Sequence, residues 1–153
     1  MSEIPAWPVA EPEAGFDFYS EDILFDLPNP AACEAWLLVV IQRERKKEGA
    51  INYIFCSDPF LHRMNVEYLQ HDTLTDVITF PYSQEIAHGD IFISIDRVRE
   101  NADELNIPFL DELHRVMAHG LLHLIGYDDQ TNETKAIMRQ KEDEYLSLFN
   151  HVT

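Results

Sequence analysis

Two histidines one helical turn apart constrain this chain more than any other feature of its sequence. His119 and His123 follow a segment of helical apolar spacing, residues 113–118, that contains no Gly or Pro. At about 100° per residue they lie roughly 40° apart on one helix face, so both imidazoles can bind one metal ion. Gly126 follows, where a helix can end in a left-handed residue. Because the turn brings Asp129 back toward the two imidazoles, we predict that His119, His123 and Asp129 bind one metal ion.

The spacing His-x-x-x-His-x-x-Gly-x-x-Asp is that of a metzincin-type zinc site with aspartate as the third ligand. The protease motif has Glu directly after the first histidine, where it acts as general base, and this chain has Gly120 there. Three protein ligands leave a fourth position for water, whose pKa a zinc ion lowers to about 7. The pattern therefore predicts a hydrolytic zinc site without the usual peptide-bond machinery. His114 lies about 140° around the helix from His119 and is expected to be off the site.

Length and composition predict one globular domain over residues 1–153, with an irregular lead-in over 1–14. A chain of 153 residues with 46% hydrophobic residues can bury a substantial core. No apolar run is long enough to cross a membrane, and the acidic, Pro-containing N-terminus does not resemble a secretory signal. Cys33 and Cys56 are expected to be free buried thiols, as is usual in the cytoplasm. We therefore expect a cytoplasmic protein that makes no use of a membrane.

The formal charge of −17 argues against indiscriminate binding of nucleic acid, because phosphate backbones are also anionic. A nucleic-acid role would need a local basic patch, the metal itself or a partner that delivers the substrate. The dense cationic run consists of Arg43, Arg45, Lys46 and Lys47. We interpret this run as the end of a predicted helix, where cations favour the C-terminal dipole. A phosphate-facing patch is the alternative.

Hydrophobic periodicity predicts an α+β fold in which helices, including a zincin-like metal helix, cover one mixed four-stranded sheet. Strands are expected at 16–25, 51–56, 76–82 and 89–95, with a turn at 83–88. Helices are expected at 30–48, 58–69, 96–105, 109–125 and 132–148. Gly49 is expected to end the first helix, 30–48, before the second strand begins at residue 51.

Several segments together resemble the YbeY family, bacterial metal-dependent endoribonucleases of ribosomal RNA maturation. Residues 119–128 read His-Gly-Leu-Leu-His-Leu-Ile-Gly-Tyr-Asp and resemble the family signature His-Gly-x-Leu-His-Leu-x-Gly-Tyr-Asp-His. Residues 75–81 read Thr-Asp-Val-Ile-Thr-Phe-Pro and resemble its Thr-Asp-Val-Leu-Ser-Phe-Pro segment. The resemblance covers roughly residues 65–146 and also includes Asn65, Tyr68, the Gly-Asp-Ile of 89–91, Met138 and Glu142.

Two departures from the family pattern bear on the site. The third ligand of the family is usually His, and this chain has Asp129, whose carboxylate can bind zinc at about 2.0–2.2 Å. Its negative charge is expected to make a bound water less acidic than three neutral imidazoles would. Many members carry Arg where this chain has Leu69, in a position suited to a phosphate. That role is vacant here or falls to Arg63, Arg97 or Arg115.

The resemblance implies a zinc-dependent endoribonuclease, with one Zn²⁺ per chain, that cleaves single-stranded ribosomal RNA. It implies action at the 3′ end of the small-subunit rRNA and in ribosome quality control, with the ribosomal small subunit or its assembly factors as partners. The residues by themselves indicate only a hydrolytic metal site. Two alternatives remain: a zinc-dependent peptidase, against which Gly120 argues, and a non-catalytic ribosome assembly factor with a structural metal.

Other polar and aromatic residues near these motifs allow two interpretations each. Thr75 and Asp76 either orient a ligand histidine or contact substrate, or they make the hydrogen bonds of a strand start. Tyr127 and Phe80 are expected to pack in the fold, although aromatic rings of this kind can stack on unpaired bases. The acidic stretch 142–144 is expected to be a solvated helix face.

Overall fold

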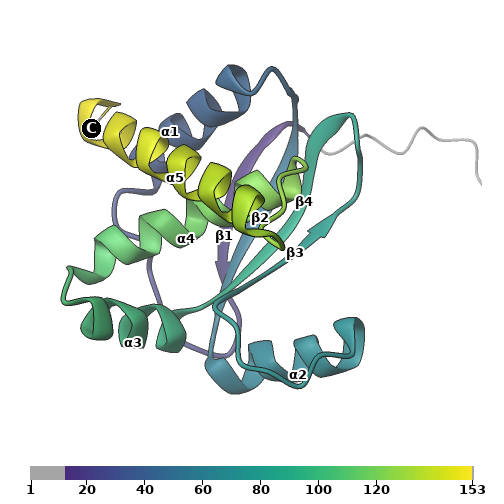
Figure 1. Cartoon of the computed structure of the whole chain (residues 1–153), viewed down its shortest axis with the longest axis vertical. Helices are drawn as coiled ribbons and strands as arrows, with labels where there is room; N and C mark the ends of the chain where they lie inside the picture. The colour runs from purple at the N-terminus through teal and green to yellow at the C-terminus, as the bar shows by residue number, and fades with distance from the viewer. Residues whose placement is uncertain (1–12, 153) are drawn as a thin grey trace, which may run out of the picture.

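The computed structural model describes residues 13–152, and within that range the chain forms four strands and five helices (Figure 1). The predicted lead-in over residues 1–14 lies outside the described residues except for its last two. The strands are β1 (Gly15–Ser20), β2 (Lys47–Cys56), β3 (Val77–Pro81) and β4 (Ile86–Ser94). The helices are α1 (Pro30–Arg43), α2 (Asp58–Leu69), α3 (Ile95–Leu105), α4 (Phe109–Leu124) and α5 (Asn132–Val152).

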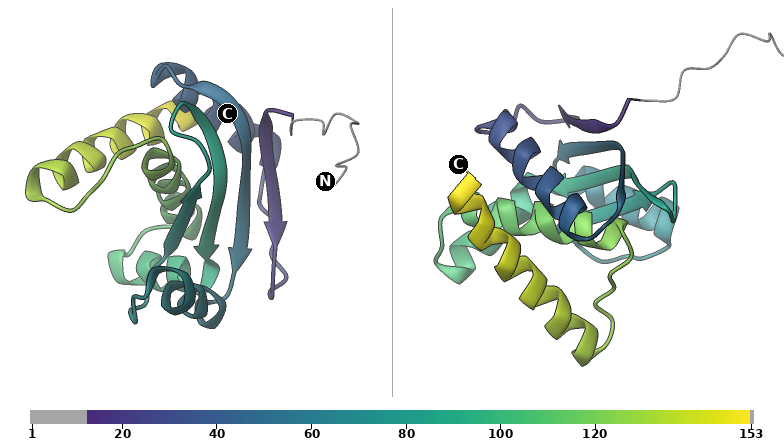
Figure 2. Two further views of the ribbon diagram at one scale, coloured as in Figure 1. Left: turned by 90° about the vertical axis from the view of Figure 1, so that its right-hand side faces the viewer. Right: turned by 90° about the horizontal axis from the view of Figure 1, so that it is seen from above.

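The four strands form one mixed sheet in the order β1-β2-β4-β3, which is visible edge to edge in Figure 2. Strands β1, β2 and β4 run parallel, and β3 pairs antiparallel with β4 at the edge. The parallel pairs need helical crossovers, which α1 and α2 with its following segment supply. The predicted α+β class with one mixed four-stranded sheet is confirmed.

The two faces of the sheet carry different helices. Helices α1 and α4 pack on one face, and α5 lies across them as an outer layer (Figures 1 and 2). Because side chains alternate along a strand, Ile91 and Ile93 of β4 enter the main core under α4, whereas Phe92 joins Ile78 in a smaller cluster under α2. Helix α4 is therefore fixed against the half of the sheet that contains the edge strand β3.

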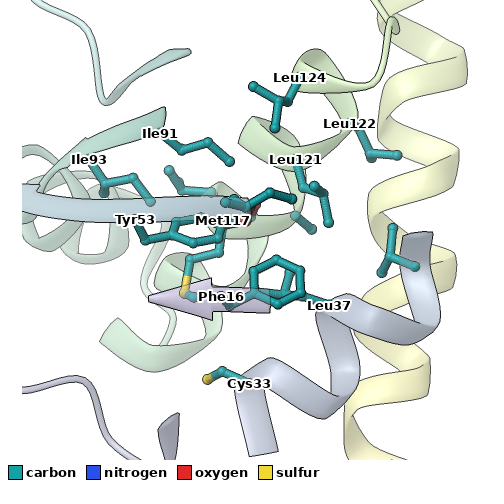
Figure 3. Close-up of a cluster of buried hydrophobic side chains, with 14 of the residues drawn as sticks. Phe16, Cys33, Leu37, Tyr53, Ile91, Ile93, Met117, Leu121, Leu122 and Leu124 are labelled. Atoms are coloured by element: carbon teal, nitrogen blue, oxygen red, sulfur yellow. Dashed lines mark hydrogen bonds between the residues drawn. The ribbon is translucent and has the colours of Figure 1, made fainter. Parts of the chain in front are cut away.

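A buried tyrosine joins the centre of the sheet to α4. Tyr53 of β2 is fully buried, and its hydroxyl donates to the backbone oxygen of Met117 (2.8 Å), next to the side chains drawn in Figure 3. Burial, with a smaller effect of Cys33, raises the pKa of Tyr53 well above its usual value. An unpartnered hydroxyl at this depth would cost roughly 1–3 kcal/mol, so the bond helps to fix α4 at one height on the sheet.

Several predicted boundaries are wrong. Helix α1 ends at Arg43 rather than at 48, because Arg45 adopts the left-handed conformation (φ 57°) and the N–H of Lys46 returns to the oxygen of Ile41 (3.1 Å). The following residues already belong to β2, and Lys47 pairs in register with Ile86, so β4 also begins earlier than predicted. Strand β1 ends at Ser20 instead of continuing to 25.

Two further expectations concern the cysteines and the membrane. Cys33 and Cys56 are both free and buried, as predicted. Burial raises the pKa of Cys33 to about 11 and that of Cys56 to about 12, so neither thiol is activated. No helix among residues 13–152 combines the length and the apolarity that a membrane span requires.

Candidate metal centre

Helix α4 ends in a motif that presents two histidines and then reverses the chain. Gly126 has a φ of +118°, which side-chain-bearing residues rarely adopt. Its N–H donates to the oxygen of His123 (3.1 Å), and the N–H of Tyr127 donates to the oxygen of Leu122 (3.0 Å). These are the paired hydrogen bonds of a Schellman helix end. The turn that we predicted at Gly126 is therefore present, and it returns Asp129 toward the helix.

The structure brings together the three side chains that the sequence analysis selected. His119 Nε2 lies 3.5 Å from one carboxylate oxygen of Asp129, and His123 Nε2 lies 3.4 Å from the other. One ligand atom from each residue lies within 4.8 Å of the other two. Donors about 2.0–2.2 Å from a tetrahedral zinc ion lie roughly 3.3–3.5 Å apart, so the two separations between histidine and aspartate are those that a zinc site needs. Their role as metal ligands stays a prediction.

The second nitrogen of each imidazole has its own acceptor. His119 Nδ1 donates to Glu142 Oε2 (2.6 Å), and His123 Nδ1 donates to the backbone oxygen of Tyr127 (2.9 Å). These bonds place the proton on Nδ1 in both rings and leave both Nε2 atoms free to act as donors to a cation. Metal-binding histidines are commonly held in this way, so the donor set fits a metal in its tautomers as well as in its distances.

Glu142 is not part of a solvated helix face, and that prediction is wrong for this residue. Its side chain is 6% exposed, whereas its neighbour Asp143 is 60% exposed. Arg115 Nη1 donates to Glu142 Oε1 (2.9 Å) while the other oxygen binds His119. Burial alone would raise the pKa of Glu142, but the hydrogen bonds from His119 and Arg115 lower it below its usual value. The result is a buried carboxylate that stays charged beside His119.

The same contact shifts the pKa of His119 in the opposite direction from that of Glu142. Burial alone would lower its pKa, but the hydrogen bond and charge of Glu142, with smaller effects of Asp76 and Asp129, raise it above its usual value. A ring in this environment interacts favourably with positive charge. The surroundings of His119 therefore favour a cation at this position, as the predicted metal site requires.

Gly120 occupies the position at which the protease motif carries its general base, and it faces the sheet. A Cβ atom added there would lie 2.8 Å from Cγ2 of Ile91 and 3.2 Å from Cγ2 of Val77. Both contacts are to branched side chains of the sheet, and Ile91 is fully buried. A glutamate at this position would enter the core and not the metal centre. The site therefore lacks the peptidase base because α4 packs too close to the sheet to allow it.

Comparison with known proteins identifies the family of this chain. The family model of endoribonuclease YbeY matches residues 27–150. An endoribonuclease YbeY of Flavobacterium johnsoniae is 52% identical over 128 residues, which cover 82% of this chain and 91% of the relative. One from Amoebophilus asiaticus is 50% identical over 137 residues, covering 88% and 93%. This chain belongs to the endoribonuclease YbeY family.

A solved structure supports the same relationship. A Thermotoga maritima protein whose structure was determined in solution aligns with a TM-score of 0.61 and 27% identity over 88% of each chain. Membership in the YbeY family confirms the predicted resemblance and the predicted class of enzyme, an endoribonuclease. The family match begins at residue 27, so it also covers α1 and β2, which the quoted sequence motifs did not reach.

The arginine expected from the YbeY resemblance has no direct replacement at this centre. Leu69 ends α2 with its side chain exposed. Of the three suggested substitutes, Arg97 pairs with Asp58 (2.7 Å), and the guanidinium of Arg63 lies 5.9 Å from the ring centre of Phe60. Arg115 is the one that reaches the centre, and it does so indirectly, through Glu142.

The remaining predicted residues mostly have structural roles. Asp76 accepts a hydrogen bond from Asn101 (3.4 Å), and its backbone oxygen accepts one from Ser94, which supports the strand-start interpretation. Burial raises the pKa of Asp76, and the nearby charge of His119 opposes this rise. Phe80 packs against neighbouring rings as expected. Thr75 donates to the oxygen of Val77, His114 packs off the site, and Tyr127 donates to Glu44.

Two acids contact the site or its turn in a way that the sequence did not predict, although Glu142 was named as part of the family resemblance. Glu142 lies on the buried stripe of α5 between Met138 and Tyr145, each at most 2% exposed, and an acid in such a stripe was the available signal. Glu44 follows α1 and accepts hydrogen bonds from the hydroxyls of both Tyr127 (2.5 Å) and Tyr145. No local pattern marked Glu44, because its partners are about 80 and 100 residues away along the chain.

Proposed function

We propose that this YbeY family member is a zinc-dependent endoribonuclease of single-stranded ribosomal RNA. It acts in the cytoplasm at the 3′ end of the small-subunit rRNA and in ribosome quality control, with the ribosomal small subunit or its assembly factors as partners. The observation that carries the proposal is the convergence of His119, His123 and Asp129 in a chain of an endoribonuclease family.

The three converging residues would hold one zinc ion. The chemistry that a bound zinc ion supplies is Lewis acidity toward a phosphoryl oxygen and toward water. The chain supplies the orientation: Glu142 and the backbone oxygen of Tyr127 fix the two imidazoles, so that both Nε2 atoms face Asp129. Arg115 in turn fixes Glu142. This arrangement keeps the donor atoms in place before a substrate arrives, which is what efficient catalysis requires.

The three candidate ligands are partly exposed to solvent. The side chains of His119 and His123 are 23% and 25% exposed, and that of Asp129 is 38% exposed. Among the side chains that the structure describes, residues 13–149, no fourth His, Cys, Asp or Glu joins this group. A structural zinc site normally has four protein ligands, so three accessible donors support a catalytic site over a structural one. The position of Gly120 against the sheet supports phosphodiester cleavage over peptide cleavage.

The test combines metal content with substrate choice. Purified protein is loaded with zinc and incubated with a single-stranded RNA, the corresponding duplex and a mixed peptide library. We expect about one equivalent of zinc per chain and cleavage of the single strand only. Peptide cleavage with intact RNA would replace the proposal by a peptidase. Unchanged RNA cleavage after complete removal of the metal would leave only a structural role for it.

Substitutions at the turn test the third donor. Asp129→Ala should lose zinc and RNA cleavage, and Asp129→His should keep both because an imidazole can replace the carboxylate as ligand. The matched control is Asp128→Ala, since Asp128 is an adjacent exposed acid that accepts a hydrogen bond from the backbone of Gln130. Equal zinc content in the Asp129→Ala and Asp128→Ala proteins would remove Asp129 from the site.

A further inference from the structure

The turn between α1 and β2 presents three consecutive cations, Arg45, Lys46 and Lys47. Arg45 and Lys47 are exposed and Lys46 is half-buried. None of the three forms an ion pair with a carboxylate anywhere in residues 13–152. By contrast, five other cations are paired with carboxylates: Arg43, Arg97, Arg115, Arg139 and Lys141. Arg63, Arg99 and Lys135 also form no ion pair among the described residues, but they are isolated along the chain. What distinguishes the turn is that three unpaired cations are consecutive.

The helix dipole does not explain this run. Helix α1 ends at Arg43, so Arg43 alone lies in its last turn, and it already pairs with Glu144 (3.6 Å). Lys47 is the first residue of β2. The interpretation of the whole run as helix-end cations is therefore wrong for Arg45, Lys46 and Lys47, and the phosphate-facing alternative is open for these three.

The fold would be better served by another residue at Arg45. Arg45 has the same position in the end of α1 that Gly126 has in the end of α4, directly after the capping residue and left-handed. A residue with a Cβ atom in this conformation costs roughly 1 kcal/mol relative to glycine. The left-handed conformation of this residue therefore gives no reason for an arginine at position 45.

Arg45, Lys46 and Lys47, which we call the basic turn, are linked to the candidate metal centre through the side chain of Glu44. Glu44, which directly precedes Arg45, accepts a hydrogen bond from the hydroxyl of Tyr127 (2.5 Å), and the backbone oxygen of Tyr127 holds His123 (2.9 Å). The charge of Glu44 is balanced by Lys141 (3.2 Å) and does not cancel the turn. Seen from above, the ends of α1 and α4 lie close together, as this contact requires (Figure 2).

We infer that Arg45, Lys46 and Lys47 bind the phosphate backbone of the single-stranded RNA beside the cleavage site. The inference rests on the proposed function and adds the surface by which an acidic protein holds its substrate. Unpaired cations next to the centre attract the polyanion locally, and the surplus of carboxylates elsewhere repels it. Glu48 is an exposed carboxylate next to the run, so residues 43–48 carry four cations and two acids in a chain of net charge −17.

The test is the salt dependence of RNA binding by zinc-loaded protein. Binding of a labelled single-stranded RNA is measured at times too short for appreciable cleavage. Each phosphate contact contributes about −0.7 to the slope of log K against log salt for single strands. The variant Arg45→Gln/Lys47→Gln should therefore lose about 1.4 from this slope and bind roughly 20-fold more weakly at 0.1 M salt. Cleavage of a dinucleotide, which is too short to reach the turn, should be unchanged.

Two controls keep charge and position apart. Arg45→Lys/Lys47→Arg retains both charges and should bind like the wild type. Arg99→Gln removes an exposed cation from α3, at the opposite end of the molecule in Figure 1, and should leave the slope unchanged. Arg45→Gly should weaken binding while the protein becomes no less stable, so that unfolding is excluded as the cause.

The outcomes separate this inference from the proposed function. If the wild type cleaves RNA but the double variant keeps its affinity and its slope, the basic turn is not the binding surface. If the double variant loses zinc together with RNA, the turn acts on the metal centre and the inference is overturned. If the double variant lost as much affinity for duplex RNA and for anionic vesicles as for single-stranded RNA, the turn would be a general polyanion site. That result would also overturn the inference. If the wild type cleaves no RNA, the proposed function itself fails.

Discussion

Two faces of α4 carry histidines five residues apart, and the comparison between them shows what makes a histidine functional. His114 is 9% exposed and packs between Trp36 and Phe149, with Cys33 Sγ 3.9 Å from its ring. His119 faces Glu142 and Asp129 instead. Burial lowers the pKa of His114, with Asp111 opposing it, whereas Glu142 raises that of His119 against burial. The same residue type therefore serves the core on one face and a cation on the other.

The sharpest way to break this comparison is to remove each histidine in turn. His119→Ala should reduce bound zinc and lower RNA cleavage by roughly 10³-fold or more, because two donors no longer hold the ion that activates water. Its stability without metal should also fall, because Oε2 of the buried Glu142 loses its hydrogen-bond donor. His114→Ala should keep zinc and cleavage but lose about 2–4 kcal/mol of stability through the cavity it leaves. Metal analysis and urea unfolding of both variants decide the matter, and exchanged phenotypes would contradict the assignment.

The next effect concerns the acceptor that distinguishes the two faces. Glu142→Gln removes the charge that orients His119, and we expect zinc affinity to fall about 10–100-fold. Asp143→Asn is the matched control, since Asp143 is an exposed neighbour that contacts Arg115 but no histidine. Competition with a chelator measures both dissociation constants. If the two variants bound zinc equally well, Glu142 would have no part in holding the metal site.

A smaller effect tests the contact between α4 and the sheet. Alanine normally favours a helix over glycine by about 1 kcal/mol, but Gly120→Ala should destabilise the protein by about 1–3 kcal/mol, because the new Cβ meets Ile91 and Val77. The loss should shrink in an Ile91→Ala background, where one of these neighbours is gone. Denaturant unfolding of the two single variants and the double variant measures this coupling. A stabilising Gly120→Ala would refute the close packing.

The smallest effect is the pH dependence that His114 brings. Because its folded pKa is lowered, the folded state binds fewer protons than the unfolded state below the usual value of 6.5. The free energy of unfolding should therefore fall as pH is lowered through 6.5, by at most about 1.4 kcal/mol per pH unit from this group. His114→Phe should lack this contribution, and the other histidines cancel in the difference between the two proteins. Parallel pH dependences would show that His114 is not held neutral.

The convergence of His119, His123 and Asp129 was predictable because these three candidate ligands lie within eleven residues. Helical geometry relates His119 to His123, and the conformational freedom of Gly126 explains the return of Asp129. Glu142 and Glu44 were missed as partners because they reach the centre from α5 and α1, across contacts that no local period encodes. Tertiary packing, and not helix propensity, decides where such acids lie.

The class of the fold and the order of its elements were predictable from the sequence, but some element boundaries were not. Alternating apolar residues indicated the strands, whereas the end of α1 was placed at Gly49 because glycine is the usual left-handed residue there. Arg45 adopts that conformation instead, and the pairing of Lys47 with Ile86 extends both β2 and β4. The misplaced boundary therefore coincides with the basic turn, where Arg45 adopts a left-handed conformation that glycine would adopt more easily.

The most direct test of the central claim is anomalous diffraction at the zinc absorption edge from crystals of zinc-loaded protein. We predict one strong peak per chain between the Nε2 atoms of His119 and His123 and the carboxylate of Asp129, with room for a non-protein ligand. A map with no peak there, or with the three side chains pointing apart, would contradict the metal centre and the function built on it.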